Sequence, residues 1–225
     1  NLQWYSQNAI AQKVKETGAL SGTVIIMEVK TGKLLAAASY PTFDPVKDIG
    51  KAGVDLSNKA LVDVFEPGST AKVMTISSAL EEGLVRPDTP VEIPNRLHRS
   101  DKTFQDSHDH GVELRTVSGT LAESSNIGTM LIGERLTPEK QESWLRKFGM
   151  GQTSGMGYPA ESRGILPAYK DWSGSQRYTI MFGSGISLTA IQATGVYQTI
   201  ANKGVRIPAR VIESTTDADG VTTPM

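Results

Sequence analysis

The first part of the chain has one segment with helical periodicity, followed by two short apolar runs. Residues 2–18 place apolar side chains near helical spacing and end at Gly18, whose flexible backbone suits a helix end. The predicted buried stripe consists of Leu2, Tyr5, Ala9 and Val14. The runs 22–29 and 33–40 flank Lys30-Thr31-Gly32, where glycine permits a tight turn. This pattern predicts a helix followed by an antiparallel hairpin.

The middle of the chain changes from irregular to helical. Residues 41–68 are rich in proline, glycine, aspartate and asparagine, which predicts an irregular surface segment. Residues 69–83 carry apolar side chains over more than a narrow stripe, which predicts a helix packed on several sides. After a polar stretch at 91–111, residues 114–136 have the pattern of a helical lobe. Residues 137–149 begin with Thr-Pro and end with glycine, as a capped helix does.

The end of the chain is less regular. Residues 149–167 are glycine-rich and predict a loop, and residues 187–204 predict a further helix. The apolar positions of 205–214 are typical of a strand, and residues 215–225 are turn-like. The alternation of hairpin, helices and strand indicates a mixed α and β fold.

Composition narrows the class of protein. The 225 residues are 38% hydrophobic and 21% charged, which suits one globular domain or one domain with an inserted lobe. With 23 Lys and Arg against 24 Asp and Glu, nothing favours binding to nucleic acid or to a membrane surface through charge. The sequence has no cysteine, which excludes disulfides, thiol catalysis and cysteine-ligated metal. No apolar run is long enough to span a bilayer.

Candidate chemistry begins at the predicted helix 69–83. Ser69 and Lys72 are three residues apart, so a helix would place them on one face. Lysine can act as a base for a serine hydroxyl when burial lowers its pKa, and the N–H groups of a helix N-terminus can stabilise an oxyanion. The alternative is an ordinary helix cap with a solvated lysine.

A second motif follows in the helical lobe. The sequence Ser-Ser-Asn at 124–126 offers the Ser124 hydroxyl as a proton relay and the Asn126 amide as a group that holds a substrate amide. Taken by itself, it reads equally as a loop or a helix cap.

Together the motifs resemble a known family. "EPGSTAK" at 66–72 and "SSN" at 124–126 are similar to the serine-x-x-lysine and serine-x-asparagine motifs of penicillin-recognising enzymes. Further stretches look like class B penicillin-binding proteins, especially the septal cell-division type. These stretches include "VKTGKLLAAASYPTFDP", "FQDSHDHG", "LAESSNIGTMLIGERL" and "FGSGISLTAIQATGVYQTIANKG". The resemblance implies the transpeptidase and serine β-lactamase-like fold: an antiparallel sheet flanked by helices, with a helical lobe.

The resemblance also implies an activity. The family acylates its serine with the penultimate D-alanine of a peptidoglycan stem peptide and transfers the acyl group to an amine of a neighbouring strand; β-lactams block it covalently. Carried over, Ser69 is the nucleophile, Lys72 the base, Ser124 the relay, and Asn126 a substrate-binding residue, without cofactor or metal. Divisome proteins, including a glycosyltransferase, are the expected partners. The implied location is the extracytoplasmic side of a cell membrane, reached through an anchor outside this chain.

One motif departs from the family pattern. The family places lysine-threonine-glycine on a strand after the second motif, whereas the only such triplet here is 30–32, which a hairpin turn explains. We therefore expect residues 1–225 to be a partial transpeptidase domain that is incomplete at its C-terminus, with the third motif beyond 225 and the anchor before residue 1.

Three other hypotheses are a metal site, a serine β-lactamase and a non-catalytic domain. His108 and His110 lie among aspartates in "DSHDHG", but no third histidine or cysteine is close in sequence, so structural hydrogen bonds are the preferred interpretation. A serine β-lactamase would need a base for deacylation, and no glutamate is obviously placed for it. A non-catalytic penicillin-sensing or divisome scaffold domain would have no physical need for Ser69, Lys72, Ser124 and Asn126 together, so the presence of all four argues against it.

Overall fold

The computed structural model describes residues 1–224, which form two compact units. The first unit contains Asn1–Val64, Gln152–Arg163 and the chain from Thr189 onward. The second contains Phe65–Gly151 and Gly164–Leu188. The chain therefore passes between the units several times. In residues 1–224, no helix combines the length and apolarity needed to cross a bilayer.

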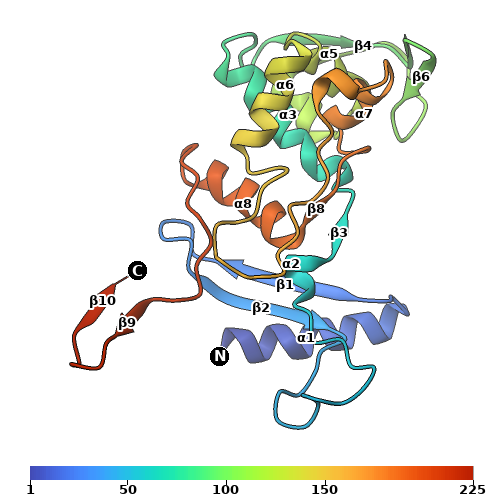
Figure 1. The fold of residues 1–225 in the computed structure, drawn as a ribbon. Helices are drawn as coiled ribbons and strands as arrows, with labels where there is room; N and C mark the ends of the chain where they lie inside the picture. The colour runs from blue at the N-terminus through green and yellow to red at the C-terminus, as the bar shows by residue number, and fades with distance from the viewer. Residues whose placement is uncertain (225) are drawn as a thin grey trace. The chain divides into compact units, whose positions relative to one another are not determined.

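The first unit is built on a hairpin of two antiparallel strands, β1 (Gly22–Met27) and β2 (Leu34–Tyr40), in which Ile25 lies opposite Ala37. Helix α1 (Leu2–Thr17) and helix α8 (Ala190–Ala201) lie on opposite sides of this hairpin (Figure 1). The other elements of this unit are α2 (Lys59–Val62), β9 (Ser214–Thr216) and β10 (Thr222–Pro224). The predicted antiparallel hairpin is thus confirmed.

Helix α1 forms where it was predicted, but the predicted buried stripe is wrong except at Val14. Leu2 and Tyr5 are exposed, whereas Ser6 and Val14 are buried. The packed face is partly polar, because the Gln7 amide donates to the Ser39 carbonyl of β2 at 2.6 Å. Backbone groups along the free edge of a strand need hydrogen-bond partners, and a glutamine can supply one where an apolar side chain cannot.

The triplet 30–32 forms the hairpin turn, as predicted. Gly32 has φ 71°, and a Cβ atom there would lie 2.1 Å from the Pro208 carbonyl oxygen, so only glycine fits. Lys30 Nζ donates to Asn202 Oδ1 at 3.0 Å. The strand predicted at 205–214 is wrong, because that segment is irregular apart from a bridge between Lys33 and Arg210 and its last residue, which begins β9.

The second unit is mainly helical, with short two-stranded ribbons around the helices (Figure 1). Its helical elements are η1 (Gly68–Ala71), α3 (Lys72–Glu81), α4 (Val117–Ala122), α5 (Asn126–Gly133), α6 (Pro138–Lys147), η2 (Tyr169–Asp171) and α7 (Gln176–Met181). Its strands are β4 (Pro90–Ile93), β5 (Arg96–Arg99), β6 (Lys102–Gln105) and β7 (Glu113–Thr116). Strands β3 (Val64–Phe65) and β8 (Leu188–Thr189) lie where the chain passes between the units.

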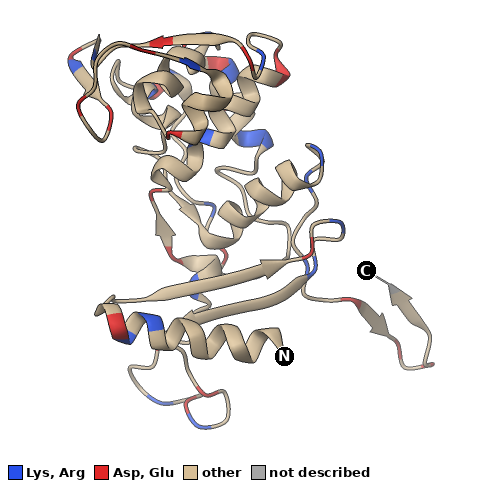
Figure 2. Ribbon diagram, turned by 180° about the vertical axis from the view of Figure 1, so that it is seen from behind, with Lys and Arg blue, Asp and Glu red and all other residues tan. Residues whose placement is uncertain are grey.

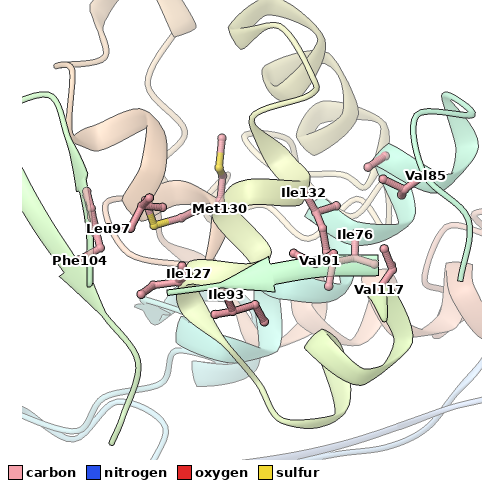
Figure 3. Packing of buried hydrophobic residues seen from close by; sticks show 12 residues of the cluster. Ile76, Val85, Val91, Ile93, Leu97, Phe104, Val117, Ile127, Met130 and Ile132 are labelled. Carbon is pink, nitrogen blue, oxygen red and sulfur yellow. The ribbon is translucent and has the colours of Figure 1, made fainter. Parts of the chain in front are cut away.

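One apolar core holds the second unit together. Figure 3 shows side chains from α3, α5 and the ribbons meeting in it. Ile127 and Met130 of α5 are fully buried, and Ile76 of α3 is nearly so. The core therefore fixes α3 against α5, the two helices that follow the sequence motifs.

Two boundaries in this unit differ from the predictions. The helix expected from residue 69 begins as the 3₁₀ turn η1, and the α-helix starts only at Lys72. The helical pattern expected from residue 114 begins as strand β7, which pairs with β4, and turns helical at Val117. Basic and acidic residues are interspersed along the described chain, in keeping with its balanced charge (Figure 2).

Candidate active site

Ser69 lies on the 3₁₀ turn η1, one turn before α3. Ser69 is exposed, and the N-cap residues of η1 and α3 make no side-chain capping hydrogen bond. Helix N-termini carry a partial positive charge, and their uncapped N–H groups can donate hydrogen bonds to an anion. The position of Ser69 therefore combines access from solvent with a favourable field for negative charge.

A glycine loop fixes the backbone just before Ser69. Gly68 N–H donates to the Gly183 carbonyl at 3.0 Å, and Gly185 N–H donates to Glu66 Oε1 at 2.9 Å. Gly183 has φ 88°, and a Cβ atom there would lie 2.1 Å from the Gly68 carbonyl oxygen. The contact between this glycine loop and the serine turn is an addition from the structure.

Lys72 is buried although its side chain is charged at neutral pH in water. Lys72 is only 1% exposed. Its Nζ contacts the carbonyl oxygen of Ser124 and lies 3.0 Å from the Ser124 hydroxyl. Burial disfavours the ammonium form and lowers the pKa of Lys72 to about 8, against an opposing effect of the Asp106 carboxylate. A lysine with this pKa holds a substantial neutral fraction at ordinary working pH.

Ser124 and Asn126 lie between α4 and α5. Ser124 has φ 57°, a left-handed conformation that is uncommon for residues with a side chain and that turns its carbonyl toward Lys72. Asn126 begins α5, and its Nδ2 donates to the Gln105 carbonyl at 3.2 Å. The second motif is thus joined both to α3 and to the end of β6.

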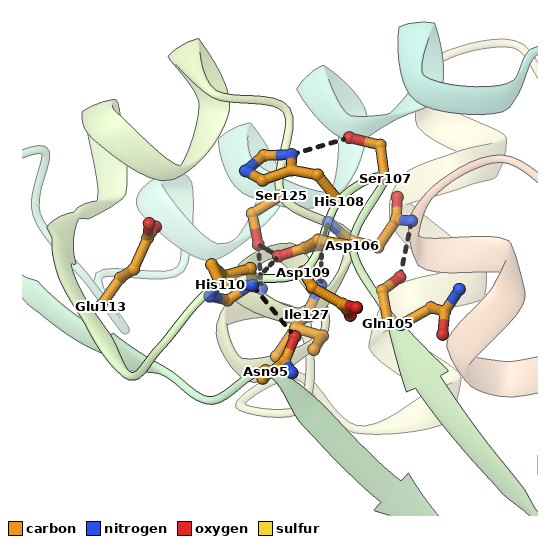
Figure 4. A network of polar contacts seen from close by, with 12 residues as sticks. Asn95, Gln105, Asp106, Ser107, His108, Asp109, His110, Glu113, Ser125 and Ile127 are labelled. Atoms are coloured by element: carbon orange, nitrogen blue, oxygen red, sulfur yellow. Dashed lines mark hydrogen bonds and ion pairs between the residues drawn. The ribbon is translucent and has the colours of Figure 1, made fainter.

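A buried carboxylate holds this segment in place (Figure 4). Asp106 accepts hydrogen bonds from the Ser125 hydroxyl at 2.7 Å, from Ile127 N–H at 3.1 Å and from Asn126 N–H. The Ser125 hydroxyl also accepts from Gly128 N–H at 2.8 Å, which caps α5. The N-terminus of α5 is therefore satisfied by Ser125 and Asp106 together.

The structure brings three of the four predicted residues into direct or near contact. Lys72 meets Ser124, and Asn126 follows two residues later. The predicted contact between Lys72 and the Ser69 hydroxyl is not formed in the described chain, since the Lys72 ammonium is turned to Ser124 instead. Ser69 and Lys72 nonetheless lie on consecutive turns at the start of one helix.

Asp106 was missed by sequence reasoning. Its segment "DSHDHG" drew attention as a metal candidate, but within residues 1–224 no three His, Asp or Glu side chains are placed so that they could hold a metal ion together. His110 Nε2 instead lies 3.3 Å from Asp106 Oδ2, and Asp109 pairs with Arg96 at 2.8 Å. No spacing or residue type in this segment marks the backbone of α5 as the partner of Asp106.

The arrangement can support acyl transfer in chemical terms. An exposed hydroxyl, a buried amine with a lowered pKa and a second hydroxyl bonded to that amine are the groups that a nucleophile, base and relay require. The uncapped turn at Ser69 adds donors for an oxyanion.

Comparison with known proteins agrees with this geometry. Residues 22–224 match the family described as the penicillin binding protein transpeptidase domain. The chain is 41% identical over 98% of its length to Penicillin-binding protein PbpB of Mycobacterium tuberculosis, and 32% identical over 91% to Peptidoglycan D,D-transpeptidase FtsI of Escherichia coli. It spans 32% and 34% of the lengths of these relatives.

Solved structures give the same result. The crystal structure of penicillin binding protein 3 from Mycobacterium tuberculosis complexed with aztreonam has a TM-score of 0.93 and 41% identity, over 99% of this chain and 50% of that one. A peptidoglycan synthetase from Bifidobacterium adolescentis has a TM-score of 0.89 and 33% identity, over 99% of this chain and 40% of that one. The predicted fold class is thereby confirmed, and the chain belongs to the penicillin-binding protein transpeptidase domain family.

Proposed function

We propose that the protein to which this chain belongs is a peptidoglycan D,D-transpeptidase that works through an acyl-enzyme at Ser69. The observation that carries the proposal is the burial of Lys72 against Ser124, one turn after an exposed serine. Burial costs a charged lysine its hydration, and a surface cap has no need of such a lysine. The buried amine therefore favours catalysis over an ordinary capped helix.

The proposed reaction follows from these positions. Neutral Lys72 takes the Ser69 hydroxyl proton as Oγ attacks the carbonyl carbon of the penultimate D-alanine. The N–H groups of the uncapped turn stabilise the oxyanion. The C–N bond then breaks, and the terminal D-alanine leaves after its amine receives a proton through the Ser124 hydroxyl. An amine of a neighbouring strand next attacks the ester and releases Ser69.

Asn126 binds the substrate in this proposal, and β-lactams react at the same site. The Asn126 amide holds a substrate amide, and its contact with the Gln105 carbonyl fixes its orientation. A β-lactam acylates Ser69 in the same way, but its amine stays attached to the acyl group and cannot diffuse away. The complexes of the Mycobacterium tuberculosis relative with aztreonam and ampicillin support this.

The setting of the whole protein is proposed from its relatives. The name of the Escherichia coli relative, FtsI, and the resemblance to septal penicillin-binding proteins support a role in septal wall synthesis with divisome partners that include a glycosyltransferase. A membrane anchor outside residues 1–225 and an extracytoplasmic site are part of the same proposal. So is a lysine-threonine-glycine strand beyond residue 225 as the third motif.

The test is the site of covalent labelling in the full-length protein. After reaction with fluorescent penicillin, peptide mapping by mass spectrometry is expected to place the adduct on Ser69, and Ser69→Ala to remove it. Ser77→Ala is the matched control, because the Ser77 hydroxyl bonds the Val73 carbonyl on the same helix away from the site. An adduct on Ser124, or one that persists in Ser69→Ala, would contradict the proposal. Rapid release of the adduct would favour the β-lactamase alternative.

A further inference from the structure

The buried carboxylate of Asp106 accepts several hydrogen bonds from the N-terminus of α5. It is 9% exposed and accepts from the hydroxyl of Ser125 and from the N–H groups of Asn126 and Ile127. These donors come from consecutive residues at the start of α5. Negative charge is favourable at a helix N-terminus, and hydrogen bonds to a charged acceptor are the stronger kind. Asp106 therefore fixes the position of this first turn.

The first turn of α5 in turn determines where Ser124 lies. Ser124 directly precedes the cap residue Ser125 and has the left-handed conformation, φ 57°. An isolated residue of this kind is held in that conformation only by its surroundings. Since both the carbonyl and the hydroxyl of Ser124 contact Lys72, any shift of Ser125 would carry these two groups away from the lysine amine.

From these contacts we propose that Asp106 is a positioning residue, whose carboxylate holds the Ser124 carbonyl and hydroxyl against the Lys72 amine. The inference rests on the proposed function of Ser69 and Lys72, and it adds a residue outside the recognised motifs. Asp106 does not touch the substrate in this account. It acts through Ser125 and the backbone of α5.

Asp106 also acts on Lys72 through its charge. The carboxylate favours the ammonium form and so raises the pKa of Lys72 against the larger lowering by burial. Replacing Asp106 by Asn removes this charge while keeping a side chain of similar shape. The proton of Lys72 should then be lost at lower pH, so that the midpoint of a rate profile governed by neutral Lys72 shifts to lower pH.

Other ionisable groups surround Asp106 and remain in place in such a variant. The small cavity of about 20 Å³ beside Ser124 is lined by Asp106, His108, His110, Glu113, Arg115 and Glu123, among others. Within this set Arg115 pairs with Glu113 at 3.1 Å and approaches Glu123 at 3.6 Å. His110 Nδ1 lies 2.6 Å from the Gly111 carbonyl, and its Nε2 faces Asp106 Oδ2. These groups are shared by variant and wild type, so the shift reports the charge of Asp106.

The test is the pH profile of penicillin acylation in the full-length protein carrying Asp106→Asn. Misplacement of a reacting group by a fraction of an ångström to an ångström lowers rates on the order of tenfold to a hundredfold. We therefore expect the plateau rate to fall by about that factor and the midpoint to move to lower pH. A residue that only supports the fold would lower stability without moving the midpoint. An unchanged plateau, or a midpoint equal to or above that of wild type, would overturn the inference.

Two further variants keep the test decisive. Asp109→Asn makes the same chemical change at an exposed side chain paired with Arg96, and wild-type rate and midpoint are expected. If Asp106→Asn fails to fold, Ser125→Ala removes one donor and leaves the charge in place, so a lower plateau at an unchanged midpoint is expected. A wild-type plateau in Ser125→Ala would then overturn the inference.

Failure of the inference is distinct from failure of the proposed function. If wild-type protein is not labelled at Ser69, the proposed function is wrong. If wild type is labelled at Ser69 with a Lys72-dependent rate and Asp106→Asn has the same profile, only the role of Asp106 is wrong.

Discussion

The second unit contains two helix starts that look alike in sequence and differ in structure. Helix α3 follows Ser69 through a 3₁₀ turn, and the N-cap residues of this turn and of α3 make no side-chain capping hydrogen bond. Helix α5 follows Ser124 and is capped by Ser125 and Asp106. Each start follows a motif serine, but the N-terminus of α3 is uncapped and that of α5 is capped. We call the first the open end and the second the closed end.

The difference gives the two helix N-termini different roles, although a motif serine precedes both. An open helix end keeps donors for a developing anion, whereas a closed end uses its donors to hold the chain. The turn η1 and the start of α3 provide Ser69 and Lys72, and the N-terminus of α5 holds Ser124, the partner of Lys72.

The largest effect is expected at the open end, from Lys72→Arg. Arginine keeps the positive charge but does not deprotonate at ordinary pH, so it cannot serve as a base. General-base catalysis contributes on the order of a hundredfold to ten-thousandfold, and the acylation rate of the full-length protein should fall by that order. Lys140→Arg is the control, since Lys140 is an exposed lysine paired with Glu82. Near-normal labelling of Ser69 in Lys72→Arg would show that lysine supplies charge alone.

An intermediate effect is expected from Gly183→Ala, which disturbs the open end from outside. Alanine would adopt φ 88° with strain, and its Cβ would press on the Gly68 carbonyl just before Ser69. We expect the acylation rate to fall by about tenfold, as for a small misplacement of the nucleophile. Labelling kinetics with fluorescent penicillin measure it.

Gly195→Ala is the matched control for this variant. Gly195 lies within α8, and a Cβ atom there meets nothing within 4 Å, so alanine should stabilise the helix by roughly 0.5–1 kcal/mol without slowing acylation. Acylation by Gly183→Ala within twofold of wild type would mean that the serine turn does not depend on this contact.

The smallest effect concerns the closed end, from Ser125→Ala. Loss of a helix cap costs about 0.5–2 kcal/mol in the free energy of unfolding, measured by urea denaturation. Thr137→Ala removes the corresponding cap of α6, where Thr137 accepts from Lys140 N–H, and a similar cost is expected. Only Ser125→Ala should also slow acylation. Equal acylation rates in the two variants would remove the distinction between a holding cap and an ordinary one.

Local signals in the sequence were sufficient for several elements. The hairpin β1–β2 and its glycine turn, helix α6 with its Thr-Pro start, and the glycine-rich loop all follow from short-range preferences. The segment 205–214 failed because its apolar residues were taken for a strand, whereas the structure pairs only Arg210 within its irregular part with the hairpin. Pairing depends on neighbours that a single segment does not reveal.

The site was predicted in its residue types but not in its contacts. Spacing placed Ser69 and Lys72 on one helix, but the direction of the Lys72 side chain depends on Ser124, which is 52 residues away. Asp106 was overlooked because two of its partners are backbone N–H groups, which every sequence contains. Contacts of this kind become visible only when the fold brings distant segments together.

The most direct test of the account is the rate constant for penicillin acylation of the full-length wild-type protein as a function of pH. The neutral fraction of Lys72 rises with pH through its lowered pKa of about 8. The rate should therefore increase about tenfold per pH unit well below pH 8 and level off above it. A profile that is flat between about pH 6 and 9, or one that keeps rising to the pKa of a free lysine near 10.4, would contradict the assignment of Lys72 as the base.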